Sequence, residues 1–172
     1  MLELNVCDLD SDVAPNRGLT EREPWTVDSG ASQSVASRTS FPSAVVRESP
    51  GSKRGQTYKG PGSDVIKNEG ELDALSVLEP GTKAKVCFQV AEVRKPLLAV
   101  SSLVDKGNMT VFDTDSFVIP AGAPEIPLIR QLIAQAQGKI PLYRERGIYK
   151  MRNWEVPKSK SEASGFTRPG KA

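Results

Sequence analysis

The sequence predicts a mainly β domain built from short strands. Thirteen prolines and fourteen glycines among 172 residues favour turns over long helices. Val86, Phe88 and Val90 alternate with Cys87 and Gln89, as in a strand with one buried face. With 38% hydrophobic and 6% aromatic residues, the chain can form one modest core. We therefore expect a single β domain with flexible ends.

Two short strands are expected near the N-terminus. Residues 2–6 alternate apolar and polar side chains, which is typical of an edge strand. Residues 25–27 form a short apolar run that leads into a turn at Asp28. Residues 37–62 are rich in Ser, Gly, Pro, Lys and Arg and predict a loop, most clearly at residues 49–55.

A hairpin with a glycine-rich tip is expected at the end of this loop. Residues 56–59 and 64–66 can form its two strands. Further turns are expected at residues 68–70 and 79–82. The tip of the hairpin would consist of Gly60, Pro61, Gly62 and Ser63.

The next segment combines a buried strand, one helical turn and a second hairpin. Residues 97–100 are a continuous apolar run, consistent with a strand that is buried on both faces. Residues 101–107 can form one helical turn that ends at a glycine. Residues 109–112 and 116–119 are expected to pair as a hairpin.

One short helix is expected, over residues 127–137, with Gly138 as its cap. The apolar residues that recur there at helical spacing are Leu128, Ile129, Leu132, Ile133 and Ala136. Residues 139–144 nearly repeat residues 125–130, which indicates a local duplication. Residues 147–151 are the last expected strand.

Charge and composition divide the chain into three parts. We expect a flexible segment at residues 1–21, a folded domain at 22–154 and a disordered basic tail at 155–172. Residues 1–30 carry seven acids and two bases, whereas residues 139–172 carry nine bases and three acids. The basic C-terminal part allows nucleic-acid binding, but it lacks interleaved aromatic residues, so we do not favour nucleic acid as a partner.

The absence of histidine excludes several kinds of site. Without histidine, Ser-His and Cys-His nucleophile systems cannot form. Cys7 and Cys87 are too few for a closed zinc site, and we expect them to be reduced thiols of an intracellular, cytoplasmic protein. We expect no metal and no cofactor. The sequence also shows no apolar run of membrane-spanning length and no signal peptide, so we expect no membrane partner.

The motif Asp28-Ser29-Gly30-Ala31 is the candidate site. It follows the apolar run at residues 25–27 directly and occurs once. Residues 113–117 contain Asp-Thr and Asp-Ser pairs but lack the glycine. An ordinary turn explains the same residues if the Asp28 side chain bonds to nearby backbone amides and Gly30 supplies a positive φ.

The motif and the segments after it resemble the retropepsin-like aspartic peptidases, most closely the protease segment of copia-type retrotransposon polyproteins. The resemblance covers about residues 22–154, and its more specific part is Lys-Pro-Leu-Leu-Ala-Val-Ser-Ser-Leu at residues 95–103. The matching segments are residues 27–32, 60–63, 88–103, 107–112 and 147–151.

This resemblance implies a closed barrel that forms one lobe of an aspartic peptidase. It implies that Asp28 is catalytic, that Ser29 hydrogen-bonds across a dimer, and that Gly30 and Ala31 complete a tight active-site loop. The hairpin tip at residues 60–63 would be the tip of a flap that closes over a bound peptide. The apolar strand behind the loop would be Leu97, Leu98, Ala99 and Val100.

Because the mechanism needs two aspartates and the motif occurs once, the implied enzyme is a homodimer. Its substrates would be extended peptides, including a parent polyprotein. The alternative is a catalytically inactive retropepsin-like relic that serves as a dimerisation or peptide-binding module.

Overall fold

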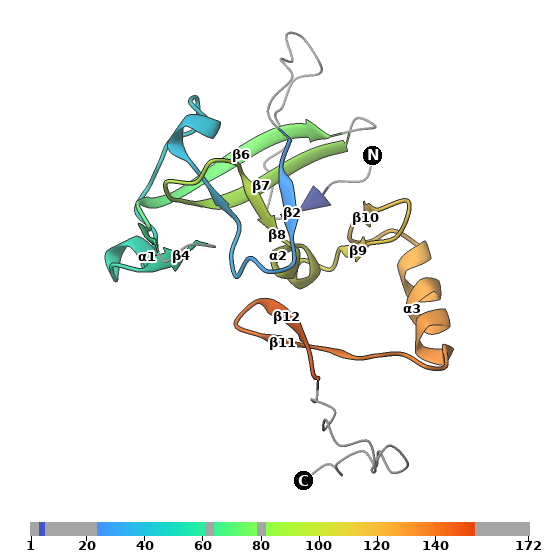
Figure 1. Ribbon diagram of the computed structural model, residues 1–172. Coiled ribbons are helices and arrows are strands. Elements are labelled where there is room, and N and C mark those ends of the chain that lie inside the picture. The colour runs from blue at the N-terminus through green and yellow to red at the C-terminus, as the bar shows by residue number, and fades with distance from the viewer. Residues whose placement is uncertain (1–3, 6–23, 61–63, 79–81, 154–172) are drawn as a thin grey trace, which may run out of the picture.

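The computed structural model describes residues 4–5, 24–60, 64–78 and 82–153 (Figure 1). The expected flexible segment at residues 1–21 (Leu4–Asn5 apart), the tail at 155–172 and three flap-tip residues at 61–63 lie outside the described residues, as does Cys7. Among the residues that are described, no helix is both long and apolar enough to cross a membrane.

A six-stranded sheet forms the body of the molecule, in the order β1-β7-β3-β8-β2, with β6 also paired to β7 (Figure 1). Its strands are β1 (Leu4–Asn5), β2 (Thr26–Asp28), β3 (Val35–Ala36), β6 (Gly70–Leu78), β7 (Thr82–Val90) and β8 (Leu97–Ala99). The expected mainly β class is thus confirmed. The pairings among the described strands leave β1 and β2 at the two ends of the path, so they do not close a barrel.

The long antiparallel hairpin β6–β7 carries the core. Its register runs from Gly70 opposite Val90 to Leu78 opposite Thr82. From Ala84 to Val90 every second residue of β7 is buried, which confirms the predicted alternation. The buried core consists of Ala36, Leu72, Ala74, Ala84, Val86, Phe88, Val90, Leu98 and Leu103. The Phe88 ring contacts the Trp25 and Phe41 rings, each at a centroid distance of 5.4 Å.

Two short strands, β1 and β3, share one hydrogen-bonding edge of β7. β1 pairs with its first half in parallel, at Ala84 and Lys85, and β3 pairs with its end in parallel, at Gln89 and Val90. β8 pairs with β3, and β2 pairs with β8. β2, which ends at Asp28, is therefore part of the sheet. Of the strand expected at residues 2–6, Leu4–Asn5 is described and lies at an edge. The strand expected at 25–27 is present one residue later, so that Asp28 ends the strand instead of lying in the turn.

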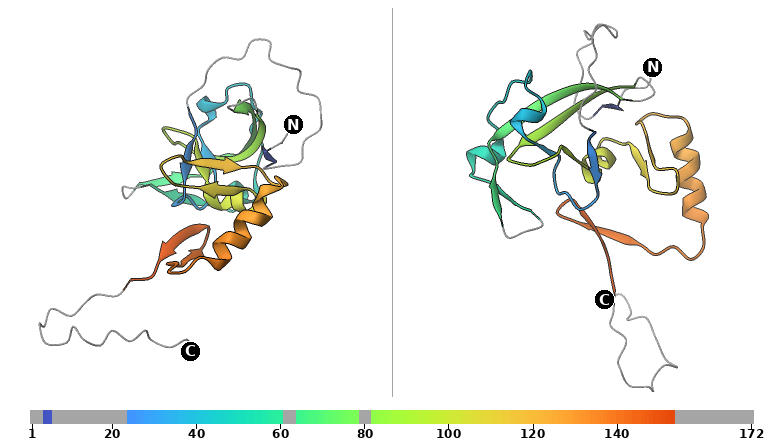
Figure 2. Two further views of the ribbon diagram at one scale, coloured as in Figure 1. Left: turned by 90° about the vertical axis from the view of Figure 1, so that its right-hand side faces the viewer. Right: turned by 45° about the horizontal axis from the view of Figure 1, so that its top comes forward.

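Three two-stranded hairpins surround the sheet: β4 (Thr57–Lys59) with β5 (Val65–Lys67), β9 (Met109–Val111) with β10 (Phe117–Ile119), and β11 (Leu142–Glu145) with β12 (Ile148–Met151). The first two were predicted, as was the strand at β12. Figure 2 shows the β6–β7 hairpin curving over one side of the domain and the β11–β12 hairpin on the opposite side of the domain.

The expectation of a single helix was wrong, because the described residues form three. They are α1 (Pro50–Lys53), α2 (Val100–Asp105) and α3 (Glu125–Gln135), together with a 3-10 turn, η1 (Arg38–Ser40). α1 lies where a loop was predicted. Ser49 caps it by accepting from the Ser52 N–H, and Ser52 reciprocates at the Ser49 N–H. A serine followed by proline at the first helical position is a helix-start signal that the loop prediction overlooked.

The other two helices differ from the predictions at their ends. α2 begins at Val100, which was expected to belong to the strand, and Gly107 follows the helix with a φ of 87°. α3 begins and ends two residues earlier than predicted, and its C-cap is Ala136 instead of Gly138. The near-repeat in sequence between residues 125–130 and 139–144 is not a repeat in structure. Residues 125–130 are helical, whereas residues 142–144 lie in β11.

Candidate active site

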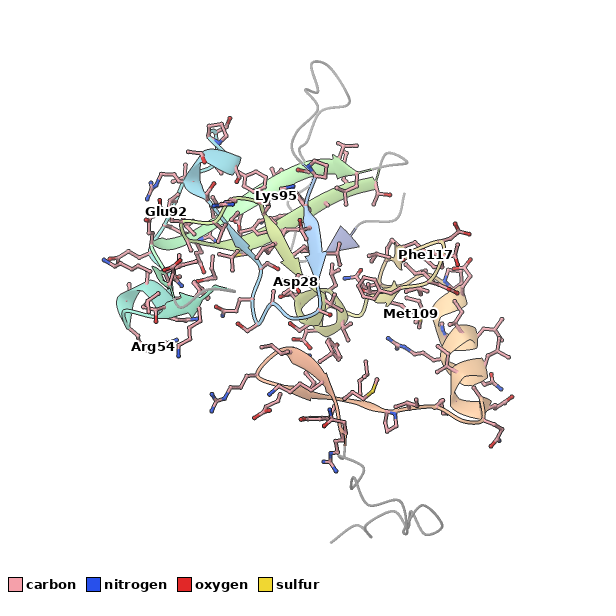
Figure 3. All side chains as sticks on the ribbon, in the orientation of Figure 1. Asp28, Arg54, Glu92, Lys95, Met109 and Phe117 are labelled. Carbon is pink, nitrogen blue, oxygen red and sulfur yellow. The ribbon has the colours of Figure 1, made fainter. Side chains whose placement is uncertain are left out.

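Asp28 lies at the end of β2, where the chain turns away from the sheet (Figure 3). β2 pairs in parallel with β8, so that Thr26, Val27 and Asp28 stand opposite Leu97, Leu98 and Ala99. Leu98, Ala99 and Val100 are all buried, with 4%, 0% and 5% of their surface exposed. The predicted apolar strand therefore does lie beside the Asp28 motif, except that Val100 already belongs to α2.

The loop from residue 29 to residue 34 is held at both ends. Asp28 Oδ1 accepts a 2.7 Å hydrogen bond from the Gly30 N–H. At the other end, the buried Ser34 Oγ accepts a 3.1 Å bond from the Ala99 N–H, which ties the loop to β8. Asp28 itself is half-buried, while Ser29 and Gly30 are exposed. The carboxylate is thus fixed in position and still reachable from outside.

Gly30 serves this loop by its small size. Its φ does not lie in the left-handed region, contrary to the ordinary-turn interpretation, although the predicted bond from the Asp28 side chain to a nearby amide is present. A Cβ atom at position 30 would lie 3.2 Å from Asp28 Oδ1. Glycine here therefore permits the close contact between the carboxylate and the Gly30 N–H.

The β11–β12 hairpin contacts the loop that follows Asp28. The Tyr149 N–H donates a 3.4 Å bond to the Ser29 carbonyl oxygen. Gly147, at a φ of 84°, packs so closely that a Cβ atom would lie 2.7 Å from the Ser32 carbonyl oxygen. Sequence reasoning named a strand here but did not predict that it contacts the Asp28 loop.

An ion pair joins the same hairpin to α2. Both terminal nitrogens of Arg144 donate to Asp105, with Nη1–Oδ1 at 2.5 Å and Nη2–Oδ2 at 2.7 Å. These bonds from Arg144 lower the pKa of the Asp105 carboxyl below its usual value. Since α2 follows β8 directly, the pair connects the hairpin to the strand that flanks Asp28.

The β4–β5 hairpin, which corresponds to the predicted flap, is joined to the Asp28 loop through Gln33. Gln33 Oε1 accepts bonds of 2.9 Å from Tyr58 Oη and from Gln56 Nε2. Of the predicted tip residues only Gly60 is described, and its N–H donates to the Asp64 carbonyl oxygen at 3.4 Å. Gln33 and Tyr58 were not recognised from the sequence, because nothing in their spacing distinguishes them from surface polar residues.

Acidic residues on β6 form a separate ion-pair cluster. Arg47 pairs with Glu71 and Asp73, each at 3.0 Å, and Lys85 Nζ lies 3.7 Å from Asp73. Burial raises the pKa of Asp73, but the hydrogen bond and charge of Arg47 outweigh it, so the pKa is lowered overall. These carboxylates are held as anions in ion pairs, which suits a structural role.

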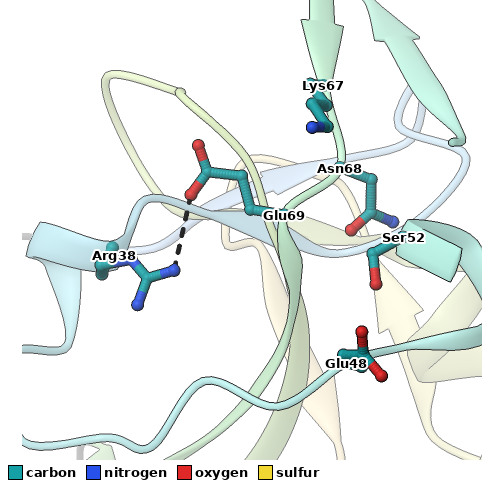
Figure 4. A pocket seen from close by; sticks show the side chains of 6 residues that line it. All are labelled: Arg38, Glu48, Ser52, Lys67, Asn68 and Glu69. Carbon is teal, nitrogen blue, oxygen red and sulfur yellow. Dashed lines mark ion pairs between the residues drawn. The ribbon is translucent and has the colours of Figure 1, made fainter.

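Two pockets lie apart from Asp28. The larger, of about 410 Å³, is lined by Arg38, Glu48, Ser52, Lys67, Asn68 and Glu69 (Figure 4). Both of its carboxylates have cationic partners, Arg38 at 3.7 Å from Glu69 and Lys53 at 3.4 Å from Glu48. The smaller, of about 230 Å³, is lined by residues 41–44 and 73–76. Neither pocket contains a predicted site residue, and neither offers an unpaired acid for catalysis.

Similarity to known proteins does not supply a family for this chain. No protein-family model, no curated protein and no solved structure matches it. The resemblance to retropepsin-like peptidases therefore stays a prediction, and the function is argued from the residues around Asp28.

Proposed function

We propose that the chain is one protomer of an aspartic endopeptidase that hydrolyses extended peptides as a homodimer. The observation that carries this proposal is the setting of Asp28. The residue ends β2 beside buried Ala99, and its carboxylate is held by the Gly30 N–H while it remains half-exposed. Catalysis by an aspartate requires this combination of fixed position and access to substrate.

The proposed reaction uses two copies of Asp28. Two carboxylates within about 3 Å of each other cannot both ionise, so the pair holds one proton and titrates as a unit. The ionised member accepts a proton from water, whose oxygen bonds to the scissile carbonyl carbon. The protonated member gives its proton to the carbonyl oxygen. When a proton then passes to the amide nitrogen, the C–N bond breaks and leaves an acid and an amine.

The second aspartate would come from a twofold-related copy. In a twofold dimer the same surface faces itself, so residues close to the axis meet their own copies. Ser29 and Gly30 are exposed beside Asp28, which supports placing the axis next to this loop. In this proposal the six-stranded sheet is one retropepsin-like lobe, the β4–β5 hairpin is its flap, and the chain derives from a copia-type polyprotein.

A peptide-cleavage assay on the purified protein tests the proposal. Parent protein should cleave peptides in a pepstatin-sensitive manner. Asp28→Asn keeps an oxygen that can accept from the Gly30 N–H but cannot act as a base, so activity should fall by about 10²–10⁴-fold. Thermal unfolding of the two proteins should coincide.

Two outcomes would contradict the assignment. Cleavage by the Asp28→Asn protein at more than about a hundredth of the parent rate would remove Asp28 from catalysis. A parent protein that forms dimers yet cleaves no peptide would favour the inactive relic over the enzyme.

A further inference from the structure

We infer that Gln33 is a positioning residue, which holds the β4–β5 hairpin against the Asp28 loop and thereby sets the affinity for a peptide bound between them. This inference rests on the proposed function, because it takes the hairpin to be the flap of that site. Gln33 lies in the loop between Asp28 and β3, so it connects the candidate catalytic residue to the hairpin.

The contact is made by one atom of Gln33. Its Oε1 accepts from Tyr58 Oη and from Gln56 Nε2, both at 2.9 Å. An amide oxygen has two lone pairs, so both are used. Tyr58 lies on β4 and Gln56 directly precedes it, which means that a single side chain holds the base of the hairpin at two points.

Asn68 fixes the direction of this network from the opposite side. Its Oδ1 accepts from the Gly70 N–H at 2.9 Å, and since a backbone N–H can only donate, the Nδ2 must face Tyr58 and Gln89. Nδ2 donates to Tyr58 Oη at 3.0 Å and to Gln89 Oε1 at 2.9 Å. Tyr58 Oη therefore accepts from Asn68 and donates to Gln33.

The network is protected from water on the Asn68 side, since Asn68 has no exposed surface. Burial also raises the pKa of Tyr58 to about 12, so its hydroxyl keeps its proton at neutral pH and remains a donor. Buried polar networks whose members are all satisfied hold one geometry, because breaking any link leaves a costly unpaired group.

Few other contacts hold the hairpin in position. β4 and β5 pair only with each other among the described strands, and Thr57, Lys59 and Val65 are exposed. Apart from the side-chain network, the Asn68 N–H donates to the Gln56 carbonyl oxygen at 3.0 Å, which joins the two ends of the hairpin to each other, and the Gln56 N–H donates to the Gly51 carbonyl oxygen of α1 at 3.0 Å. Loss of the Gln33 acceptor should therefore free the hairpin, and a peptide would then bind at the cost of ordering it again.

Two variants of Gln33 separate the acceptor from the rest of the side chain. Gln33→Met has a similar length but no acceptor, whereas Gln33→Glu keeps oxygen atoms that can accept from Tyr58 and Gln56. Gln131→Met makes the same change on the exposed surface of α3 and serves as the control. Thermal unfolding of all four proteins checks that each is folded.

The first measurement is amide hydrogen exchange in β4 and β5, which requires no activity. We expect exchange in Gln33→Met to be at least about fivefold faster than in the parent. Loss of a bond worth about 1 kcal/mol changes the equilibrium for opening by about that factor. Gln33→Glu and Gln131→Met should match the parent. Equal exchange in Gln33→Met and the parent would overturn the inference.

The second measurement is ligand affinity, from pepstatin binding by calorimetry and from KM and kcat for a cleaved peptide. Gln33→Met should weaken pepstatin binding and raise KM by a similar factor, with kcat within about twofold, because the catalytic carboxylate is untouched. Gln33→Glu should restore the parent values. Unchanged affinity in Gln33→Met would overturn the inference.

The two proposals can fail separately in this design. If the parent binds pepstatin in a Gln33-dependent manner but cleaves no peptide, the enzyme proposal fails and the positioning role stands. If the parent cleaves peptides and Gln33→Met behaves like Gln131→Met, the enzyme proposal stands and the positioning role fails. If the parent neither cleaves peptides nor binds pepstatin, both are overturned.

Discussion

Asp28 on β2 and Ala99 on β8 stand opposite each other in parallel register, and the chain leaves the sheet directly after each of them. Ala99 has no exposed surface, and its N–H is bound by Ser34 at the far end of the Asp28 loop. Residue 99 is thus enclosed by its neighbours, and a hydrogen bond ties the strand that carries it to the loop.

Enlarging the side chain at position 99 should disturb the site. Ala99→Leu places three more carbon atoms in a fully packed position, so we expect a loss of about 1–3 kcal/mol in the free energy of unfolding. The Asp28 loop should shift with β8, and peptide cleavage should fall with stability. Urea unfolding and the cleavage assay measure the two effects.

Ala134→Leu is the matched control, because Ala134 is exposed on α3. It should change the free energy of unfolding by no more than about 0.5 kcal/mol. Equal stability of both variants would show that the region behind the loop can adjust, which would contradict tight packing at Ala99.

Two glycines, Gly147 in the turn between β11 and β12 and Gly138 between α3 and β11, allow steric contact to be distinguished from backbone strain. Gly147 and Gly138 have φ values of 84° and 72°, so an alanine costs about 1 kcal/mol in backbone conformation at each. Only at Gly147 would the new Cβ also meet the Ser32 carbonyl oxygen, at 2.7 Å, whereas nothing lies within 4 Å at Gly138.

Gly147→Ala should therefore destabilise the protein more than Gly138→Ala, by an additional 1–3 kcal/mol or so, as for other overpacked sites. Because the contact is with the Asp28 loop, only Gly147→Ala should also lower peptide cleavage. Thermal unfolding and the cleavage assay compare the variants. Identical losses in both would mean that the hairpin does not press on Ser32.

The ion pair between Arg144 and Asp105 predicts a pH-dependent contribution to stability. Arg144 lowers the pKa of Asp105 in the folded protein below the usual 3.8, so folding is favoured while Asp105 is ionised. The contribution is present above about pH 4 and is lost as the pH falls through the folded pKa. Asp105→Asn should thus be less stable than the parent at pH 7, with a gap that closes at low pH.

Urea unfolding between pH 2 and pH 7 measures this gap, and Asp115→Asn, at an exposed acid in the β9–β10 turn, is the control. The pair is solvent-exposed, so the gap should be small and should shrink at high salt. A gap that widened on acidification would contradict the assignment of the pair.

Activity should depend on protein concentration if Asp28 needs its own copy. Below the dimer dissociation constant, cleavage should fall as the square of the protein concentration. We expect this at about micromolar protein, the scale of weak specific association. Excess Asp28→Asn protein should inhibit the parent, because mixed dimers hold one competent aspartate.

Sedimentation over the same dilution series gives the oligomeric state independently. Constant specific activity in a protein that sediments as a monomer throughout would rule out a shared active site. A further check is that Gly138→Ala, which changes a residue away from the Asp28 loop, should follow the dilution curve of the parent.

Local patterns predicted most of the strands. Alternation identified β7, the short apolar run identified β2, and glycine-containing turns identified the β4–β5 hairpin, because each signal lies within a few neighbouring residues. α1 was missed because a stretch rich in serine and glycine outweighed its Ser-Pro start signal. Val100 was assigned to a strand because an apolar residue between strand and helix has no distinguishing pattern.

The contacts around the candidate site could not be predicted from local sequence patterns. Gln33, Tyr58, Asn68 and Gln89 come from three separate segments, and only the folded chain brings their amides and hydroxyl together. Likewise, Arg144 reaches Asp105 from a hairpin much later in the chain. The motif at Asp28 could be recognised, but its supports could not, since a single sequence does not specify which distant polar residues meet.

The contact between Tyr149 and Ser29 has a consequence for how the protein is made. The loop that begins at the N-terminal end of the domain receives its last support from the C-terminal hairpin, and β2 itself pairs with a strand from the middle of the chain. Such distant pairings form late in folding because long loops must close first. On a ribosome, the segment around Asp28 leaves the exit tunnel early, but the loop lacks its Tyr149 support until the β11–β12 hairpin has emerged. Under the proposed function, the nascent chain would therefore have no assembled active-site loop before that point.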